Sequence, residues 1–564
     1  MSNEPARSSG RVDEASGSSA SPGLVALERG DYASAASLLA AAIEAGEKTA
    51  ANYRGLGLAF IKSEQPVKAI QALEQALSLN AEDLGAQHNL GLALMKAGRY
   101  AEALPRLRRS VEAMPTYWEA HWAVGTTLVA LGLVREGIVG LRRAVELAPE
   151  RHDIHAVLLF SLELSPDATL EEQQAERRRW YERHAASPAT PSRPLLNRKS
   201  PERRVRVGYV SADFRAHSAA MIFGPVIRYH DRNAFEIFCY SGIESNDVLA
   251  ESLRAAADRW RPTAKMSDED LEALIRDDEV DILVDLSGHT KGHRLAIFAR
   301  RAAPIQVTAW GFATGTGIPA MDYFFSDPVA VPREVRHLFA ETVVDLPCCF
   351  CYEPPGDAPE VSPLPSLEGQ PFTFGCINRI QKISDPAIAL WARILREMPG
   401  SRLLLKSHSL SNEAVRAETL RRFAGAGMSE DRLLLLSHTD IYHHMQALHQ
   451  VDLGLDPFPA NGGITTAETL WMGVPVVTVL GKTTHGRLSG ALLHALGMPD
   501  WIATNEDEYV RIALEFAEDR EHLDRLRRGM REELMRTPVF NVREYTRLVE
   551  ANYRLWWQKW CRQA

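Results

Sequence analysis

Hydrophobic residues divide the chain into two regions with different patterns. Before about residue 165, small and large apolar residues recur in the arrangement typical of paired helices. From Arg204 onward, short apolar runs are separated by helical patterns, which predicts strands of mostly parallel sheets. We expect a first series of strands at Val205–Ser211, Phe235–Ser241, Asp281–Leu286, Ile305–Gly311 and Met321–Phe325. A Pro-rich stretch follows at Tyr352–Gln370. We expect a second series of strands after it, at Phe372–Ile377, Arg402–Lys406, Arg432–Ser437, Asp452–Leu455 and Val474–Leu480. Two doubly wound lobes in sequence imply a cleft between them, with ligands at the carboxyl ends of the strands.

A period of 34 residues runs through the helical region. Gly57, Gly91 and Gly125 follow this spacing, and Ala35, Ala69, Ala103 and Gly137 repeat with the same period. Small residues at such positions let the two helices of a hairpin approach closely, and this is the tetratricopeptide pattern. We therefore expect an α-helical solenoid over residues 24–165, with a concave groove that binds extended peptide. The alternative is an array that only docks on the rest of the chain. Trp118 and Trp122 are expected to pack in its core.

The other segments complete a provisional domain map. Residues 1–23 are expected to be a disordered tail, because they are rich in Ser, Gly, Pro and charge. Residues 166–201 are expected to form a linker helix with a solvated charged face, Thr169–Ala186, and a linker. The two lobes are placed at residues 202–365 and 366–540. Residues 541–564 should form a docking helix, whose aromatic stripe is Tyr553, Trp556, Trp557 and Trp560.

Composition excludes several classes of protein. The chain has 564 residues and a net charge of −9, so nothing overall favours nucleic acid or an anionic membrane. No run of 18 apolar residues predicts a membrane span. The six cysteines are unevenly scattered, which fits a reducing cytosol, and we expect a cytoplasmic protein. Cys348, Cys349 and Cys351 cluster, and a buried apolar strand is their expected location rather than a metal site.

The most informative motif for function is D-P-F-P-A-N-G-G-I-T-T-A-E at Asp456–Glu468. A strand runs into a Pro/Asn/Gly turn, and Thr465 and Thr466 then lie at the start of a helix. Free backbone N–H groups, two hydroxyls and the positive end of a helix dipole would suit a phosphate. Glu468 could accept hydrogen bonds from a ribose diol. The alternative is that Thr465 and Glu468 form only a capping box.

Further candidates follow other strands. His217 lies just after the first strand, although a lone His is often structural. Gly311 begins a glycine-rich turn that would allow close approach to a ligand, or that is only a turn. Arg379 and Lys382 could neutralise a diphosphate, or be surface cations. Metal ligation by His443, His444 and His449 is conceivable, but no acidic cluster supports it.

These segments in combination resemble one family. Tetratricopeptide units followed by V-G-Y-V-S-A-D-F-R-A-H, A-P-I-Q-V-T-A-W-G-F-A-T-G-T-G, N-R-I-Q-K and D-P-F-P-A-N-G-G-I-T-T-A-E-T-L-W-M-G-V-P-V-V-T resemble the O-linked N-acetylglucosamine transferases, including their plant SPINDLY-like relatives. The likeness is greatest to bacterial members, which have few repeats. It implies a GT-B fold of two Rossmann-like lobes. It also implies an inverting transfer from a nucleotide sugar, without a metal or other cofactor, to Ser or Thr of a protein held by the repeats.

The resemblance also implies roles for individual residues. Lys382 matches the diphosphate-binding lysine, and His217 matches a histidine proposed as general base or sugar-orienting group. Glu468 matches the acidic residue bonded to ribose, and His444 matches the histidine stacked on the base. The remaining substrate-binding positions are Asn378, Arg379, Gly311, Gly463, Ile464, Thr465 and Thr466.

Departures from the family pattern concern the donor. Arg379 stands where animal members carry Gln, and Gly463 and Ile464 stand where they carry His and Thr. The segment here looks more like the plant relatives, some of which transfer fucose from a guanine nucleotide. The main hypothesis is transfer of N-acetylglucosamine from UDP-N-acetylglucosamine. The alternatives are fucose from GDP-fucose, glucose from UDP-glucose, or a peptide-binding scaffold whose lobes bind nucleotide without turnover.

Overall fold

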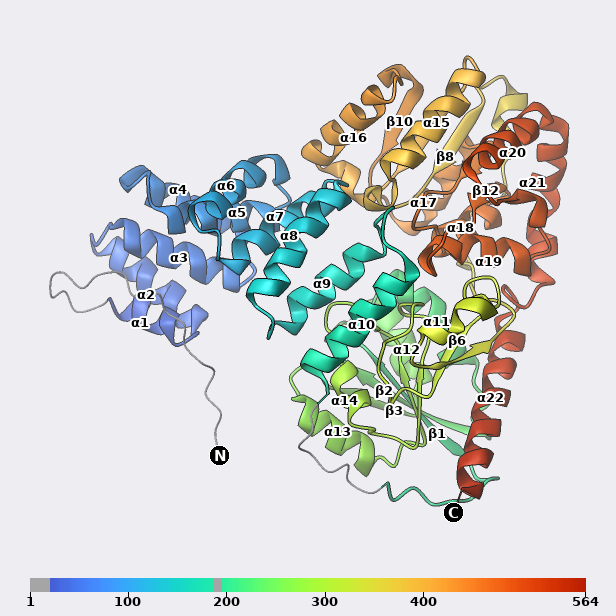
Figure 1. Cartoon of the computed structure of the whole chain (residues 1–564), viewed down its shortest axis with the longest axis horizontal. Coiled ribbons are helices and arrows are strands. Elements are labelled where there is room, and N and C mark those ends of the chain that lie inside the picture. The colour runs from blue at the N-terminus through green and yellow to red at the C-terminus, as the bar shows by residue number, and fades with distance from the viewer. Residues whose placement is uncertain (1–20, 187–194, 564) are drawn as a thin grey trace. The chain divides into compact units, whose positions relative to one another are not determined.

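The computed structural model describes residues 21–186 and 195–563 and separates into two compact units, residues 1–115 and 116–564 (Figure 1). The predicted tail falls mostly outside the described residues. The first helix begins at Pro22, two residues before the predicted start of the array. The helices of the first unit are α1 Pro22–Glu28, α2 Tyr32–Glu44, α3 Ala50–Lys62, α4 Pro66–Leu79, α5 Leu84–Lys96 and α6 Tyr100–Ala113.

The repeated glycines lie where the two helices of a hairpin meet. A Cβ at Gly57 in α3 would come within 2.4 Å of Leu73 in α4, and one at Gly91 in α5 within 2.7 Å of Leu107 in α6. Any larger residue at these positions would therefore force the two helices of a hairpin apart, because the interface between them is already close-packed. This confirms the physical reason inferred for the period of 34 residues.

The second unit begins with helices of the same kind: α7 Trp118–Ala130, α8 Val134–Leu147 and α9 His152–Leu162. Gly125 and Gly137 face each other across the α7/α8 hairpin, where a Cβ on Gly125 would lie 2.7 Å from the Gly137 carbonyl oxygen. Trp118 and Trp122 pack, partly buried, against the apolar core of these helices, as predicted.

Helix α10, Leu170–His184, corrects in part the prediction of a solvated charged helix. Its residues Arg177 and Gln174 are buried. The Arg177 guanidinium donates to the Glu163 carboxylate just after α9, and the Gln174 amide donates to the Thr314 carbonyl oxygen at 2.8 Å. One face of α10 is buried because the helix packs between α9 and the first lobe, and a buried charge such as Arg177 requires a partner. Glu171, Arg178 and Arg179 are exposed, so a solvated charged face is present as well.

The first lobe contains a parallel sheet of seven strands in the order β3-β2-β1-β4-β5-β6-β7. The strands are β1 Val205–Ser211, β2 Phe235–Ser241, β3 Arg259–Pro262, β4 Ile282–Asp285, β5 Ile305–Thr308, β6 Tyr323–Ser326 and β7 Thr342–Asp345. Helices α11 Ser218–Tyr229, α12 Val248–Ala256, α13 Asp268–Asp277 and α14 Leu295–Ala299 connect them. The order is that of a doubly wound nucleotide-binding sheet.

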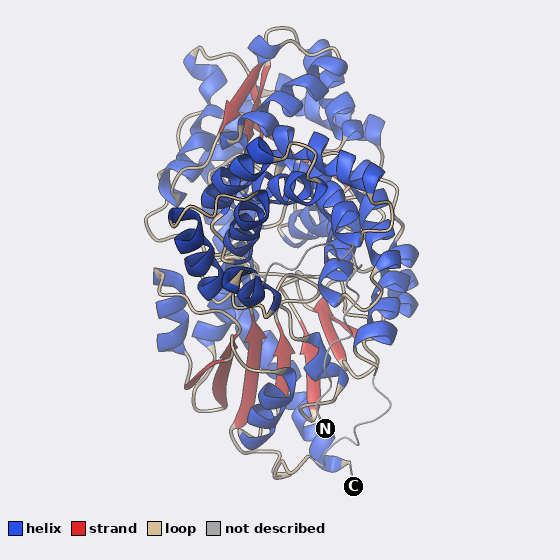
Figure 2. Cartoon of the chain, turned by 90° about the vertical axis from the view of Figure 1, so that its left-hand side faces the viewer, coloured by secondary structure: helices blue, strands red, loops and turns tan. Residues whose placement is uncertain are grey.

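The second lobe repeats this topology, with the order β10-β9-β8-β11-β12-β13. The strands are drawn in red among the blue helices in Figure 2. Its strands are β8 Thr373–Cys376, β9 Arg402–Lys406, β10 Leu433–Leu436, β11 Leu453–Leu455, β12 Val476–Val479 and β13 Ile502–Ala503. Its helices are α15 Asp385–Glu397, α16 Glu413–Gly425, α17 Ile441–Gln446, α18 Ile464–Trp471, α19 Leu488–Ala495, α20 Glu506–Glu518 and α21 Arg520–Met535. The predicted class, a helical repeat array followed by two Rossmann-like lobes, is confirmed.

The final helix, α22 Val542–Arg562, packs on the first lobe. Its Tyr553 and Trp557 are completely buried. The Trp556 ring stacks on Tyr323 of β6 with ring centroids 3.9 Å apart. Tyr553, Trp556 and Trp557 of the aromatic stripe are therefore core, as predicted, whereas Trp560 is only partly buried. Among the described residues, every helix is too short or too polar to cross a bilayer.

Candidate functional site

The turn between β11 and α18 is built around a buried carboxylate. Asp456 accepts hydrogen bonds from the Gly462 amide at 2.9 Å and from the Thr478 hydroxyl at 2.7 Å. Burial raises the pKa of Asp456 to about 6. A Cβ at Gly462 would lie 2.0 Å from the Thr466 hydroxyl oxygen, so only glycine fits there. At Gly463 a Cβ would meet nothing within 4 Å, so this face of the turn is open.

Helix α18 begins without a side-chain cap. Gly463 occupies the N-cap position, and within the described residues the amides of Gly463, Ile464 and Thr465 donate to no protein acceptor. Thr465 lies inside the first turn, and its hydroxyl donates to the Asn378 side-chain oxygen at 3.1 Å. The capping-box alternative, which requires Thr465 at the N-cap, is therefore wrong. Unpaired amides at a helix N-terminus favour an anion.

Lys382 reaches this turn from the end of β8. Its ammonium group donates to the Asn461 carbonyl oxygen, and its side chain is largely buried. Burial, reinforced by the nearby charge of Arg379, lowers the pKa of Lys382 to about 8. A cationic side chain thus lies beside the uncapped N-terminus of α18, and both features favour an anion. The role that the sequence assigns to Lys382 stays a prediction, but its position is compatible with that role.

Glu468 and His444 lie together on the same side of the lobe. Glu468 is 3% exposed, and its carboxylate is 3.4 Å from the His444 ring nitrogen Nε2 in α17. The other two histidines of this segment point elsewhere. His443 contacts Asp440 at 2.6 Å, and His449 contacts the Glu360 carbonyl oxygen at 2.9 Å. The three histidines therefore do not converge on one ion.

His217 begins the first helix of the other lobe. Its Nδ1 accepts the Ala219 amide hydrogen at 3.2 Å and caps α11, while Asp213 lies 3.7 Å away. A neutral ring whose Nδ1 accepts must carry its hydrogen on Nε2. Burial lowers the pKa of His217, Asp213 opposes this shift, and Arg379 contributes to it. Residues of the two lobes therefore lie within electrostatic reach of each other.

Arg379 is a cation without a hydrogen-bonding partner. Its side chain is exposed, and its guanidinium makes no hydrogen bond in the part of the chain that the structure describes. Surrounding protein lowers its pKa by desolvation, against the attraction of Asp213. Five N–H donors therefore remain available beside Lys382 and His217.

The glycine-rich turn after β5 approaches protein backbone. A Cβ at Gly311 would lie 1.5 Å from the Leu286 carbonyl oxygen, and one at Gly317 would lie 2.8 Å from Arg177 of α10. Packing within the chain therefore accounts for these glycines without a ligand. Contact between Gly311 and a sugar stays a prediction.

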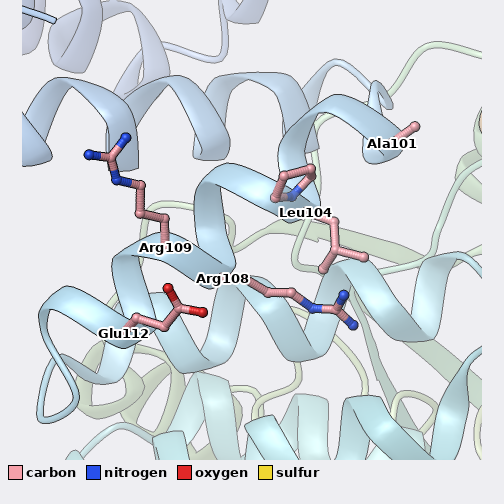
Figure 3. A pocket seen from close by; sticks show the side chains of 6 residues that line it. Ala101, Leu104, Arg108, Arg109 and Glu112 are labelled. Atoms are coloured by element: carbon pink, nitrogen blue, oxygen red, sulfur yellow. The ribbon is translucent and has the colours of Figure 1, made fainter. Parts of the chain in front are cut away.

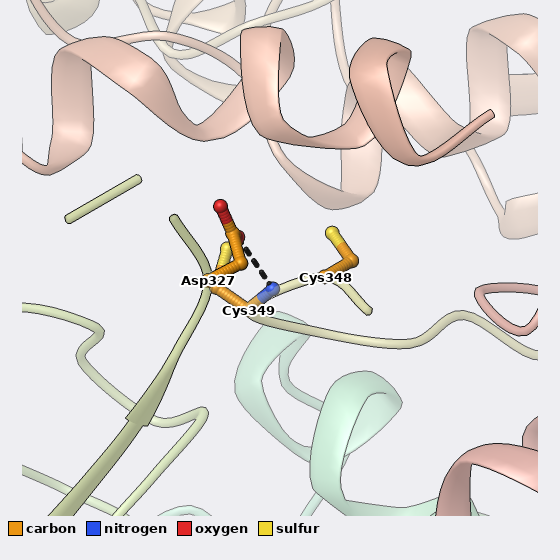
Figure 4. Close-up of side chains that lie close together, drawn as sticks. All are labelled: Asp327, Cys348 and Cys349. Atoms are coloured by element: carbon orange, nitrogen blue, oxygen red, sulfur yellow. Dashed lines mark hydrogen bonds between the residues drawn. The ribbon is translucent and has the colours of Figure 1, made fainter. Parts of the chain in front are cut away.

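The cysteine cluster is buried but does not lie in a strand. Cys348 and Cys349 follow β7 in an irregular segment, and together with Asp327 they bring three ligand-type atoms within 4.8 Å of one another (Figure 4). The Asp327 carboxylate already accepts the amides of Val329, Ala330 and Cys349 at 2.7–2.8 Å. We interpret the group as a packed turn. The predicted burial of the cysteines is confirmed, but the predicted strand is wrong, because β7 ends at Asp345 and the buried apolar residues after it form no strand.

A hollow on the first unit is lined by α6 alone (Figure 3). Its residues are Ala101, Leu104, Pro105, Arg108, Arg109 and Glu112, and Arg109 pairs with Glu82 at 2.9 Å. The mixture of charges gives it no clear preference for one ligand.

Sequence reasoning missed the residues that support the site. Asn461 anchors Lys382, Asp456 holds the turn and Ser489 pairs with the Thr466 hydroxyl at 2.8 Å. The sequence signal for Asp456 and Asn461 was present, because polar residues in a turn directly after a buried strand are candidates for backbone support. Nothing near Ser489 in the sequence marks it.

Comparison with known proteins identifies the family to which the chain belongs. A model for glycosyl transferase family 41 matches residues 189–354 and 366–549, and tetratricopeptide-repeat models match residues 23–83 and 60–123. The chain is 36% identical over 375 residues to a Petunia hybrida protein named as a probable UDP-N-acetylglucosamine–peptide N-acetylglucosaminyltransferase SPINDLY, covering 65% of this chain and 40% of that protein. It is 23% identical over 475 residues to the UDP-N-acetylglucosamine–peptide N-acetylglucosaminyltransferase of Caenorhabditis elegans, covering 63% and 41%.

A solved structure extends the match to the fold. A mutant O-GlcNAc transferase from Thermobaculum terrenum superposes with a TM-score of 0.82 at 34% identity, covering 91% of this chain and 98% of that one. The chain spans about two fifths of the length of the curated plant relatives. Because the family model covers more than half of its residues, the chain belongs to glycosyl transferase family 41.

Proposed function

We propose that the protein transfers N-acetylglucosamine from UDP-N-acetylglucosamine to Ser or Thr hydroxyls of proteins, with inversion at the anomeric carbon. The observation that carries this proposal is the pairing of Lys382 with the uncapped N-terminus of α18. The printed names of the plant and nematode relatives and of the bacterial structure support the donor and the acceptor class.

The electrostatic problem of the reaction is the departing diphosphate. The acceptor hydroxyl attacks the anomeric carbon from the face opposite the nucleotide while the bond from that carbon to the diphosphate oxygen breaks. The hydroxyl proton is released to solvent, and negative charge develops on the leaving phosphate oxygens. Lys382, Arg379 and the amides of Ile464 and Thr465 stabilise this charge, with no metal required in the proposal. Removing one such group typically costs about 10²–10³ in rate. Glu468 and His444 hold the ribose and the base.

His217 acts as a hydrogen-bond donor in this proposal. Its Nδ1 accepts from the Ala219 amide, so the hydrogen of the neutral ring lies on Nε2, which cannot accept a proton in that tautomer. The ring therefore orients a sugar or acceptor oxygen. The general-base role, which was the other possibility from the resemblance, requires the ring to leave its capping position.

The repeats supply the protein partner in this proposal. Tetratricopeptide arrays bind extended peptide along their grooves, and the models for these repeats match residues 23–123. We place the protein in the cytoplasm. This is supported by its six cysteines, which all lie in the described chain and form no disulfide.

Calorimetry of UDP against GDP tests the donor. We expect UDP to bind and UDP-N-acetylglucosamine to support transfer to a peptide array. Lys382→Met should abolish transfer, whereas Lys265→Met, which removes an exposed lysine paired with Glu244, should not. Tight GDP binding without a UDP response would replace this proposal with fucosyl transfer from GDP-fucose. Binding of either nucleotide without transfer to any acceptor would replace it with the scaffold function.

A further inference from the structure

A buried ion network joins the end of the helix array to the second lobe. Glu163, directly after α9, is 2% exposed. One of its carboxylate oxygens accepts from Arg177 of α10, and the other contacts Nδ1 of His485 at 3.0 Å. The Arg177 and His485 contacts keep the pKa of Glu163 below its usual value, although burial opposes this. The carboxylate is therefore ionised, and His485 must be the donor.

His485 contacts the turn between β11 and α18, residues 456–463, which is the phosphate-binding turn of the proposed function. It begins the short 3-10 helix η7, His485–Arg487, in the loop that follows β12. Its backbone oxygen accepts the Asn461 amide hydrogen at 2.9 Å, and the Asn461 carbonyl oxygen accepts from Lys382. A Cβ on the neighbouring Gly486 would lie 2.5 Å from the Pro459 carbonyl oxygen. The loop and the turn are thus in close backbone contact.

Apolar contacts reinforce the same connection. The His485 ring packs on Phe312 of the first lobe with centroids 5.0 Å apart, and Phe312 stacks on Phe160 of α9 at 5.9 Å. Ala460, in the phosphate-binding turn, belongs to the apolar cluster of α8 and α9. The helix array, the first lobe and the turn therefore meet at His485.

We propose that His485 is a positioning residue for the donor diphosphate, held in place by Glu163 and Arg177. The Glu163–His485 hydrogen bond fixes the loop whose backbone holds Asn461, and Asn461 fixes the ammonium group of Lys382. Donor binding thereby depends on Glu163 at the end of α9 and on Arg177 of α10. This inference rests on the proposed function, because it assumes that the diphosphate binds at Lys382.

The choice of variant follows from the network. Replacing Glu163 would leave Arg177 buried without its counter-ion, and such losses destabilise the whole protein. Arg177 already has two guanidinium nitrogens, Nε and Nη1, that are buried without a partner among the described residues. His485→Ala removes the connection to the turn and leaves the Arg177–Glu163 pair intact.

The experiment compares three variants by calorimetry with the nucleotide that binds the wild-type protein. His485→Ala should weaken binding about tenfold, the typical effect of one lost hydrogen bond to a charged group. His485→Asn keeps a donor near the Nδ1 position and should restore most of the affinity. His184→Ala, which removes a histidine of α10 that contacts His155 and not the turn, should bind like wild type.

Kinetics separate positioning from general damage. We expect His485→Ala to raise the KM for the nucleotide sugar and to leave the KM for the acceptor peptide unchanged. If His485→Ala does not fold, His485→Phe, which keeps the contact with Phe312 but cannot donate, takes its place. The inference is overturned if His485→Ala, or His485→Phe in its place, binds the nucleotide as tightly as the wild-type protein. It is also overturned if His485→Asn loses as much nucleotide affinity as His485→Ala. Failure of the wild-type protein to bind UDP or GDP overturns the proposed function itself.

Discussion

The lowered pKa of Lys382 predicts how donor binding depends on pH. The group is protonated below about pH 8 in the free protein, and its ordinary pKa is 10.5. A diphosphate binds the protonated form, so binding above pH 8 requires uptake of a proton. Affinity for the nucleotide sugar should therefore be constant from pH 6.5 to about 7.5. It should then fall as the pH rises through 8.

The size of the effect follows from the same shift. Lowering the pKa from 10.5 to about 8 corresponds to about 3 kcal/mol of cost for the charged form. A bound diphosphate offsets much of this cost. Each pH unit above 8 therefore weakens binding by up to about tenfold, until the pH reaches the pKa that Lys382 has in the donor complex. The nucleotide sugar is the ligand to use, because its diphosphate diester does not change charge in this range.

Calorimetry from pH 6.5 to 9.5 with two variants checks this reasoning. Lys382→Arg keeps the positive charge at every pH, so its affinity should be independent of pH over this range. Lys382→Met should bind more weakly and should also lose the pH dependence. The reasoning fails if wild-type affinity is flat to pH 9.5, or if Lys382→Met retains the same slope.

Three further predictions concern the surrounding residues. His217→Ala should lower kcat about 10²-fold, because a hydrogen-bond donor to a reacting oxygen is lost, and should leave nucleotide affinity within about twofold, measured by kinetics and calorimetry. Glu468→Ala should weaken UDP binding about tenfold and remove discrimination between UDP and 2′-deoxy-UDP, because the carboxylate that binds ribose in the proposed function is lost. Gly462→Ala should lower the free energy of unfolding by about 1–3 kcal/mol and weaken donor binding, whereas Gly463→Ala should be tolerated in thermal unfolding.

Each of these has a result that would contradict it. A loss of nucleotide affinity in His217→Ala as large as the loss in kcat would assign the ring to ground-state binding. Persistent discrimination against 2′-deoxy-UDP in Glu468→Ala would place the ribose elsewhere. Equal unfolding temperatures for the two glycine variants would mean that the turn relaxes around a new Cβ at Gly462.

Sequence patterns predicted most strands because their apolar runs are local. The bounds of β1, β2 and β9 agree with prediction, while β3, β7 and β13 were missed. The missed strands are short, β13 having only two residues, and the residues of β3 and β7 are half-buried or exposed, so no continuous apolar run marks them. Each lies at an edge of its sheet, where one side lacks a neighbouring strand.

The supporting contacts of the site were beyond sequence reasoning because their partners are distant in the chain. Lys382 and Asn461 are 79 residues apart, and Glu163 and His485 are 322 residues apart. Local periodicity carries no information about such pairs. The charged segment of α10 was misinterpreted in part for the same reason, since the burial of Arg177 depends on Glu163 and on the first lobe.

Helix α22 gives the chain an order of assembly during translation. The ribosome completes the first lobe's strands long before it makes Tyr553, Trp556 and Trp557, which fill the lobe's core. Until then, Tyr323 and Phe325 of β6 lack their aromatic partners and remain open to chaperones or to other nascent chains. The second lobe must therefore be synthesised before the first can mature, so a stop codon just upstream of Val542 would damage the first lobe although all of its strands are made.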